Sequence, residues 1–384
     1  MAFGDCDLGL WIGDRWNVVY HFTLAHARLH SMGNQRSGQI ENPLPLANRI
    51  LCIGHIAWSY DLPNFTVIVI QGKGKILVVR GGAIGDFILT IPVLQALKKN
   101  FPATHIEVLG YPKVANLAIE AGWAHSTRSI EAPGLARFFA PVGQVPPEWL
   151  QYFAQFNIII TYLFDPDSLF QNNVSLAGKH HYIKGPHRPD ERLNLHAVDV
   201  FLKPLEKLAI YETGVLPDLS RIGALKRKKT DLKRRIALHP GSGSTKKNWP
   251  LKNWIRLTEE LLNNTDVEVL IVGGEAERES AEKLDGLFPK DRTRLFMNRP
   301  LEEVARALSH SQAFIGHDSG ISHIAAGLGT PSVILWGPTN MKIWRPLGKH
   351  VTIIESEKGL EGIYPKQVIR EIIRLIETGT SSQQ

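Results

Sequence analysis

Cysteine is scarce in this sequence, and its scarcity excludes several kinds of protein. The two cysteines, Cys6 and Cys52, both precede the first clear strand pattern. The folded body therefore has neither a disulfide framework nor a cysteine-based zinc cluster, and a reducing compartment such as the cytoplasm is expected. The chain begins without a basic segment followed by an apolar block, which argues against a secretory signal. The most apolar nearby stretch, 50–70, is interrupted by Asp61 and Pro63 and is too broken for a clean membrane span.

The composition is typical of a soluble globular protein. Of 384 residues, 43% are hydrophobic and 21% are charged, so nothing indicates wholesale disorder. The length suffices for two domains of ordinary size, each with its own core. A formal net charge of +7 favours anionic partners, although it does not distinguish nucleotides, phospholipids and nucleic acids.

The chain divides into a segment without a pattern and a body with a regular one. Residues 1–72 show no sustained hydrophobic period. We expect this segment to be a poorly ordered extension or a small accessory element packed on the first domain. A second methionine, Met32, leaves open that Met1 is a start site placed too far upstream. For the body we expect a domain at 73–225, a second at 226–362, and a C-terminal helix and tail at 363–384.

Short apolar runs alternate with helical segments throughout this body. The expected strands are 76–79, 106–109, 157–161, 236–238, 267–272, 313–315 and 332–335. Such runs are typical of parallel strands covered on both faces, so we expect an α/β protein with two doubly wound, Rossmann-like domains. Loops at the strand ends of two such domains should meet across one cleft.

Two helices carry additional signals. Pro92 is expected to bend the helix at 86–100, because proline removes a backbone donor inside it. The last helix has residues spaced for one buried stripe, and we expect it to dock on a neighbouring domain. The stripe consists of Val368, Ile369, Ile372, Ile373 and Ile376.

Residues 179–235 are unusually basic, with runs of Lys and Arg at 226–229 and 233–235. A solvated linker is the plainer interpretation of such charge runs. The alternative is a patch that faces anionic lipid or an acceptor substrate.

The most informative stretch is 75–86, where an apolar strand leads into closely spaced glycines and the start of a helix. In α/β folds this arrangement presents helix N-terminal amides to a ligand, so Gly82 and Gly85 are candidate substrate contacts. Asp86 would repel a pyrophosphate on the same amides, which disfavours a dinucleotide fingerprint and an NAD oxidoreductase. Its carboxylate is better suited to accepting a proton, and we predict Asp86 as a catalytic residue.

A second candidate loop, 239–250, combines backbone amides, hydroxyls and two lysines just before a helix. Amides and hydroxyls at a helix start can hold phosphate oxygens, and a lysine can neutralise charge on a leaving diphosphate. We therefore predict Gly241, Ser242 and Ser244 as substrate contacts and Lys247 as a catalytic residue. The plainer alternative is a loop capped by its own Ser and Thr side chains.

Two further loops follow strands of the second domain. Glu277 could accept hydrogen bonds from ribose hydroxyls, although the helix dipole explains a glutamate at a helix start nearly as well. The other loop gathers Asp318, Ser319, Gly320 and His323. An N-cap accounts for one of these residues but not for the whole cluster, so we expect ligand contact there.

Three of these motifs together resemble glycosyltransferase family 9, whose best-known members are the ADP-heptose lipopolysaccharide heptosyltransferases. The motifs are 80–86 with Pro92, 239–250, and 318–323 with 337–339, in the family's order. The resemblance implies a GT-B fold of two facing Rossmann-like domains, with the acceptor at the first and the nucleotide sugar at the second. It also implies Asp86 as the base, Lys247 as the diphosphate contact and Glu277 near the ribose.

The implied reaction inverts the anomeric centre: Asp86 takes a proton from an acceptor hydroxyl, which attacks as the nucleoside diphosphate leaves. The resemblance implies ADP-heptose as donor, a lipopolysaccharide or related lipid-linked glycan as acceptor, and peripheral contact with the inner face of the cytoplasmic membrane. We expect no cofactor besides the co-substrate, no metal and no nucleic-acid partner. Asp165-Pro166-Asp167 is interpreted as a turn rather than a metal site, because no second acidic cluster accompanies it.

Two alternatives remain open from the sequence. The chain could be a transferase of the same fold that uses another nucleotide sugar, or a catalytically silent nucleotide-sugar-binding protein. The presence of both Asp86 and Lys247 disfavours the silent protein, because binding alone requires no proton acceptor.

Overall fold

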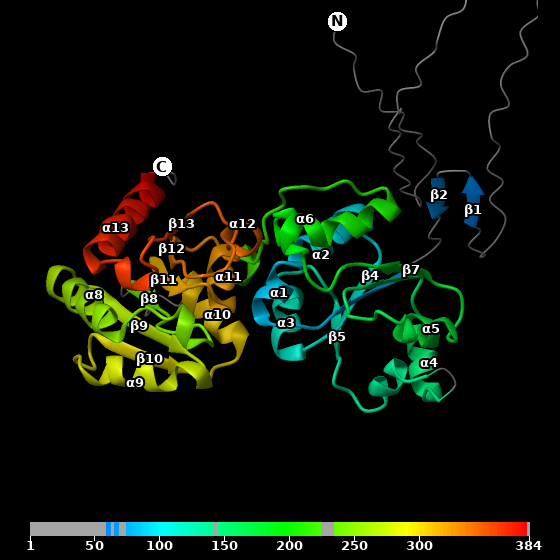
Figure 1. The fold of residues 1–384 in the computed structure, drawn as a ribbon, viewed down its shortest axis with the longest axis horizontal. Helices are drawn as coiled ribbons and strands as arrows, with labels where there is room; N and C mark the ends of the chain where they lie inside the picture. The colour runs from blue at the N-terminus through cyan, green and yellow to red at the C-terminus, as the bar shows by residue number, and fades with distance from the viewer. Residues whose placement is uncertain (1–58, 63–64, 69–73, 142–143, 224–233, 382–384) are drawn as a thin grey trace, which may run out of the picture. The chain divides into compact units, whose positions relative to one another are not determined.

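The computed structural model describes residues 59–62, 65–68, 74–141, 144–223 and 234–381. Most of the expected N-terminal extension and the basic run at 226–229 lie outside these residues, and the expectations about them stay predictions. Within the described part, two parallel sheets with helices on their faces account for most of the chain (Figure 1). A separate antiparallel pair consists of β1 (Ser59–Leu62) and β2 (Phe65–Ile68).

The first sheet has five parallel strands in the order β5-β4-β3-β6-β7. They are β3 (Lys75–Arg80), β4 (His105–Gly110), β5 (Ser126–Ser129), β6 (Ile158–Thr161) and β7 (His181–Lys184). Successive side chains of the central strand β3 point to opposite faces, and both faces are buried. Ile76 and Val78 contribute to one hydrophobic cluster, whereas Leu77 and Val79 contribute to another. Burial on both faces explains the continuous apolar run in the sequence.

Helices cover both faces of this sheet. They are α1 (Ile84–Ile88), α2 (Ile91–Asn100), α3 (Pro112–Glu120), α4 (Pro147–Phe153), α5 (Leu169–Ser175) and α6 (Ala197–Leu202), with the 3₁₀ turns η1 (Leu135–Phe139), η2 (Glu191–Leu193) and η3 (Lys203–Leu208). The short helix α7 (Ser220–Gly223) follows them in the chain and packs on α3. The predicted helix with a bend at Pro92 is two helices, separated by a turn at Leu89 and Thr90. Pro92 lies in the first turn of α2, where its missing N–H costs nothing.

The second sheet has six parallel strands in the order β10-β9-β8-β11-β12-β13. They are β8 (Arg235–Leu238), β9 (Glu268–Gly273), β10 (Thr293–Met297), β11 (Ala313–His317), β12 (Ser332–Leu335) and β13 (Val351–Ile354). Its helices are α8 (Leu251–Asn264), α9 (Arg278–Gly286), α10 (Leu301–Ser309), α11 (Gly320–Gly327), α12 (Met341–Trp344) and α13 (Pro365–Ser381), with η4 (Thr245–Lys247), η5 (Glu275–Glu277) and η6 (Leu360–Gly362). Both sheets and their helices confirm the α/β class.

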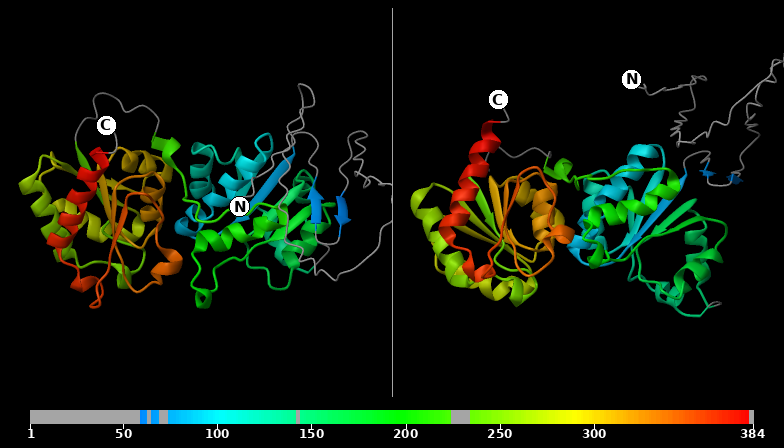
Figure 2. Two further views of the ribbon diagram at one scale, coloured as in Figure 1. Left: turned by 90° about the horizontal axis from the view of Figure 1, so that it is seen from above. Right: turned by 45° about the horizontal axis from the view of Figure 1, so that its top comes forward.

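The terminal helix α13 differs from the expectation in two respects. It packs on α8 and on β11 and β12, so it covers the second sheet rather than a neighbouring domain (Figure 2). Val368 and Ile372 are buried as expected, but Ile373 is 46% exposed and Leu375 is buried instead. The helical period of 3.6 residues places Leu375 on the buried face and rotates Ile373 away from it.

Four strands of the two parallel sheets were missing from the sequence-based prediction, β5, β7, β10 and β13, as was the antiparallel pair of β1 and β2. The strand β5 has the sequence Ser-Thr-Arg-Ser and lacks an apolar run. The strand β7 lies inside the basic stretch for which a solvated linker was the plainer interpretation, and that interpretation is wrong at 181–184. Both are edge strands of the first sheet, where a short polar strand is common because one side of it remains unpaired.

The two sheets lie in one compact unit of the structure, in which α1, a helix beside the first sheet, packs against α11, a helix beside the second. This packing is close, because a Cβ on Gly320 would lie 2.5 Å from Cβ of Ile84. Among the described helices, none is both long enough and apolar enough to cross a membrane.

Candidate functional site

Asp86 lies in the first turn of α1, directly after the glycine turn that ends β3. Its Oδ2 accepts a hydrogen bond from the backbone N–H of Ala83 at 3.0 Å, and its side chain is 24% exposed. Gly82 has φ +97°, and a Cβ on it would lie 2.9 Å from Asp86 Oδ2. Glycine is therefore required both by the left-handed backbone and by the space that the carboxylate occupies. The carboxylate has a fixed position and remains accessible to a substrate.

Lys247, in η4, forms an ion pair with Asp318 at the end of β11. The distance from Lys247 Nζ to Asp318 Oδ2 is 2.7 Å. The lysine side chain is 32% exposed and the aspartate side chain 9%, so the ammonium group has its counter-ion on the buried side and solvent on the other. A cation in this position can still attract an anion such as a diphosphate. The pair joins two of the predicted loops.

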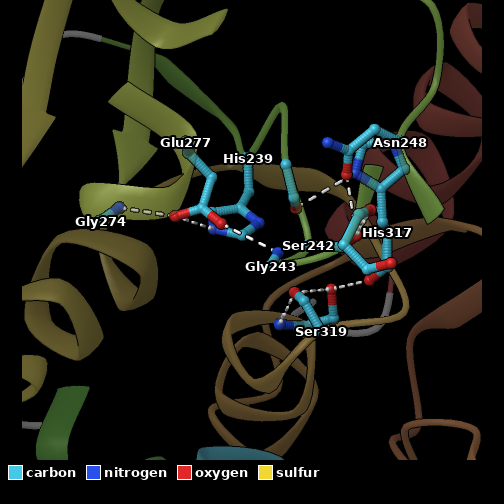
Figure 3. A network of polar contacts seen from close by, with 11 residues as sticks. His239, Ser242, Gly243, Asn248, Gly274, Glu277, His317 and Ser319 are labelled. Atoms are coloured by element: carbon cyan, nitrogen blue, oxygen red, sulfur yellow. Dashed lines mark hydrogen bonds and ion pairs between the residues drawn. The ribbon is translucent and has the colours of Figure 1, made fainter. Parts of the chain in front are cut away.

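Hydrogen bonds within the loop itself hold the predicted phosphate-binding residues, as Figure 3 shows. The hydroxyl of Ser242 donates to Asn248 Oδ1 at 2.8 Å and lies 3.0 Å from the carbonyl oxygen of Ser244. These contacts match the plainer interpretation of the sequence, a loop capped by its own side chains. They also fix the direction of the loop amides, which a phosphate would need.

Glu277 fastens this loop to the next one. Its Oε2 accepts from Gly274 N–H at 2.8 Å and its Oε1 from Gly243 N–H at 3.1 Å (Figure 3). A Cβ on Gly241 would lie 2.2 Å from Cγ of Glu277, so only glycine fits there. Both carboxylate oxygens already accept backbone bonds, and a ribose hydroxyl would have to use their remaining lone pairs.

Two buried histidines lie beneath the loop. Burial lowers the pKa of His239 to about 4 and the pKa of His317 to about 3, so both rings are neutral at pH 7. His317 Nε2 accepts from Trp249 N–H at 2.7 Å, which leaves Nδ1–H to donate to the carbonyl oxygen of Gly241 at 3.2 Å. The neutral ring thus connects both ends of the 241–249 segment.

The start of α11 carries the remaining predicted residues. Ser319 is the N-cap, and its hydroxyl accepts weakly from Ser322 N–H at 3.4 Å. His323 is 5% exposed, and burial lowers its pKa to about 4 against the attraction of Asp318. A Cβ on Gly85 would lie 3.2 Å from Cδ2 of His323, so this ring packs against the residue next to Asp86.

The structure therefore brings most of the predicted residues into one connected group. Asp86 follows Gly85, which lies against His323, and the helix of His323 begins beside Asp318, the partner of Lys247. Glu277 joins this group only indirectly, through the 241–243 loop. The arrangement can supply a carboxylate, a cation and oriented amides to a ligand that spans the two sheets.

The acidic pair Asp165 and Asp167 lies outside the group. Asp165 is buried, and its carboxylate accepts from Phe170 and Gln171 N–H at 3.2 Å, whereas Asp167 is exposed. The interpretation as a turn is confirmed, because the carboxylate of Asp165 caps α5. Across the described residues, no three His, Cys, Asp or Glu side chains gather in a way that could hold a metal ion.

Sequence reasoning missed several polar residues beneath the site. Arg80, His239, His317 and Asn248 all contact predicted residues or the loops that carry them. A signal for the first three was present, since each is a polar residue at the end of a buried strand. Such a residue must find partners, and the ends of parallel strands are where functional loops begin.

Comparison with known proteins shows which family this part of the chain resembles. Residues 199–367 match the family described as glycosyltransferase family 9 (heptosyltransferase). A lipopolysaccharide heptosyltransferase 1 from Salmonella typhimurium is 33% identical over 105 residues, which cover 27% of this chain and 32% of that protein. A lipopolysaccharide heptosyltransferase 3 from Escherichia coli is 24% identical over 290 residues, which cover 68% of this chain and 83% of that protein.

A solved structure agrees with these relatives. The E. coli ADP-heptose lipopolysaccharide heptosyltransferase II has a TM-score of 0.65 at 16% identity, covering 80% of this chain and 99% of that one. This similarity confirms the GT-B fold that the motifs implied. The resemblance drawn from the sequence is also confirmed: residues 199–367 match the family 9 domain, and the relatives found are lipopolysaccharide heptosyltransferases.

Proposed function

We propose that this chain transfers a heptose-type sugar, with inversion, from a nucleotide sugar to a lipopolysaccharide or related lipid-linked glycan. ADP-heptose is the proposed donor, because the related E. coli structure is described as an ADP-heptose enzyme. The proposed acceptor follows from the names of the lipopolysaccharide heptosyltransferases that resemble the chain. The reaction is placed in the cytoplasm, with peripheral contact at the inner face of the membrane.

One observation carries the proposal. Asp86 and Lys247 follow strands of different sheets, yet a chain of contacts joins them: Gly85, next to Asp86, lies against His323, and the helix of His323 begins beside Asp318, which pairs with Lys247. A transferase needs these two charges on opposite sides of the sugar, one for the attacking hydroxyl and one for the leaving diphosphate. A protein that only binds a nucleotide sugar needs the second charge alone.

The proposed step is a direct displacement. Asp86 accepts the proton of the acceptor hydroxyl while the oxygen of that hydroxyl forms a bond to the anomeric carbon. The bond from that carbon to the diphosphate oxygen breaks, and the nucleoside diphosphate leaves with the electron pair from the opposite face. Lys247 and the amides of the 241–244 loop stabilise the negative charge that develops there. This scheme uses no metal and no cofactor, and each of these absences is part of the proposal.

The test is a donor panel combined with two variants. Purified protein is incubated with a lipid-linked core glycan and with ADP-heptose, GDP-sugars or UDP-sugars, and transfer is measured by mass spectrometry. We expect transfer from ADP-heptose. Asp86→Asn should lower kcat by about 10²–10⁴-fold, the usual contribution of a general base, with little change in ADP affinity measured by calorimetry. Lys247→Met should weaken ADP binding as well.

A matched control separates loss of the base from general damage. Asp199 in α6 also accepts a backbone N–H, from Gly214 at 2.9 Å, and Asp199→Asn should leave kcat unchanged. Full activity of Asp86→Asn would remove this residue from the mechanism. Transfer only from another nucleotide sugar would support the same-fold alternative, and nucleotide binding without transfer would support a silent binding protein. Activity that EDTA abolishes and one added metal restores would overturn metal independence.

A further inference from the structure

Arg80 is the last residue of β3, the central strand of the first sheet, and a buried arginine is unusual at such a position. Its side chain is 2% exposed. A buried cation is costly unless several partners compensate it, so its contacts indicate what it does. Burial lowers the pKa of Arg80, with Asp86 opposing this effect, and an arginine in this position stays charged.

The closest partners of Arg80 lie on three different segments. The guanidinium carbon lies 4.4 Å from the centre of the Phe201 ring in α6, within cation–π range. Nη1 donates to the carbonyl oxygen of His187 at 3.0 Å, in the loop after β7. Nη2 donates to the carbonyl oxygen of Asp86 at 3.3 Å and lies 3.6 Å from its Oδ1.

These contacts hold the Asp86 carboxylate from two sides. Its Oδ2 bonds to Ala83 N–H at 3.0 Å, and its Oδ1 faces the guanidinium group of Arg80. Rotation about the side-chain bonds of Asp86 would break one or both interactions. The same guanidinium group fixes the backbone at His187. The ring of His187 packs edge-on against the exposed Phe164, with the two ring centres 4.7 Å apart.

We propose that Arg80 is a positioning residue, which orients the Asp86 carboxylate for proton removal and couples it to the loop at His187. This inference rests on the proposed function, in which Asp86 is the base. The planar guanidinium group donates to two carbonyl oxygens in fixed directions and forms an ion pair with the carboxylate, whereas a lysine ammonium is a compact point charge that cannot reproduce this fork. The kind of cation at this position therefore determines where the carboxylate points.

The test compares two Arg→Lys variants in the same domain. Arg128 is the matched control, because its guanidinium group also stacks on two aromatic rings, Trp149 at 4.2 Å and Tyr152 at 4.3 Å. Arg80→Lys should lower kcat by about 10–100-fold, because a displacement near 1 Å can cost about 10²-fold. The KM for the donor and the calorimetric affinity for ADP should stay within about twofold. Arg128→Lys should leave kcat within about twofold.

Two further measurements keep the proposal testable if Arg80→Lys folds poorly. Phe201→Leu removes the ring beneath the guanidinium group but keeps the charge, and it should lower kcat by about 3–10-fold without affecting ADP affinity. Crystal structures should show that the Asp86 carboxylate leaves Ala83 N–H in Arg80→Lys and stays in Arg128→Lys.

The outcomes for the two proposals differ. An unchanged kcat together with an unchanged Asp86 carboxylate in Arg80→Lys overturns the positioning role. Equal losses of kcat in Arg80→Lys and Arg128→Lys overturn it as well, because they indicate general destabilisation. If the wild-type protein transfers no sugar from any donor, the proposed function fails, and the crystal structures still decide whether Arg80 orients Asp86.

Discussion

Acid should destabilise this protein through its buried neutral histidines, two of which lie beneath the 241–249 segment. His317 is fully buried, and burial lowers its pKa to about 3 from the ordinary value of 6.5. Below pH 6.5 the unfolded chain therefore binds a proton that the folded protein does not. The free energy of unfolding must then fall as the pH decreases from 6.5 towards 3 and must be independent of this group above 6.5.

The size of the effect follows from the pKa difference. Each pKa unit corresponds to about 1.36 kcal/mol, so at pH 5, about 1.5 units below the unfolded pKa, His317 should cost about 2 kcal/mol. His239 and His323, with pKa values of about 4, should each cost nearly as much at pH 5. His239 and His317 interact with each other, so the contributions of these two rings need not add.

The assay is urea unfolding of the wild-type protein and of His317→Asn at pH 7 and pH 5. Asparagine retains one donor and one acceptor but does not titrate. Because each protein is compared with itself at two pH values, the cost of the altered contacts to Trp249 and Gly241 cancels. The free energy of unfolding should fall by about 2 kcal/mol less in the variant than in the wild type. Identical pH dependence in the two proteins would refute the assignment of a buried neutral ring.

Two other substitutions test the packing of the site. Gly320→Ala should lower kcat at least about tenfold, because the new Cβ would lie 2.5 Å from Cβ of Ile84 and would separate α11 from the helix that carries Asp86. The control is Gly286→Ala, whose Cβ would meet no atom within 4 Å. Equal kcat values in the two variants would contradict this prediction. Glu277→Ala leaves two backbone N–H groups without their acceptor. Urea unfolding should show a free energy of unfolding lower by about 1–3 kcal/mol for each of these groups that water cannot reach. Calorimetry should show a lower affinity for ADP. The exposed Glu275→Gln should change neither property, and a stable Glu277→Ala protein would show that the loop does not depend on this carboxylate.

Much of the fold was predictable because it depends on local patterns. The strands β3, β6, β8, β9, β11 and β12 contain continuous apolar runs, and burial on both faces requires such runs; in β4 only Glu107 interrupts the run. The edge strands were not predictable in this way. The residues of β5 are held in the sheet by backbone pairing with β4, which the side chains do not reveal.

The candidate site divides in a similar manner. Asp86, Lys247 and Asp318 could be selected because each follows a strand and carries a charge, and parallel strands end at one edge of a sheet. Their roles as base and diphosphate contact stay predictions. The contacts of Glu277 with Gly243 and of Arg80 with His187 could not be foreseen, because these residues come from segments that the sequence leaves far apart.

The sequence alone thus determined the alternation of strands and helices, the family resemblance and the order of the charged loops, since these depend on periodicity and on residues close together in the chain. Only the tertiary structure decided which charges pair, which carboxylate oxygens are already occupied and which cation orients Asp86. Those outcomes depend on distances of a few ångströms between remote segments, which are fixed by the packing of whole helices and sheets.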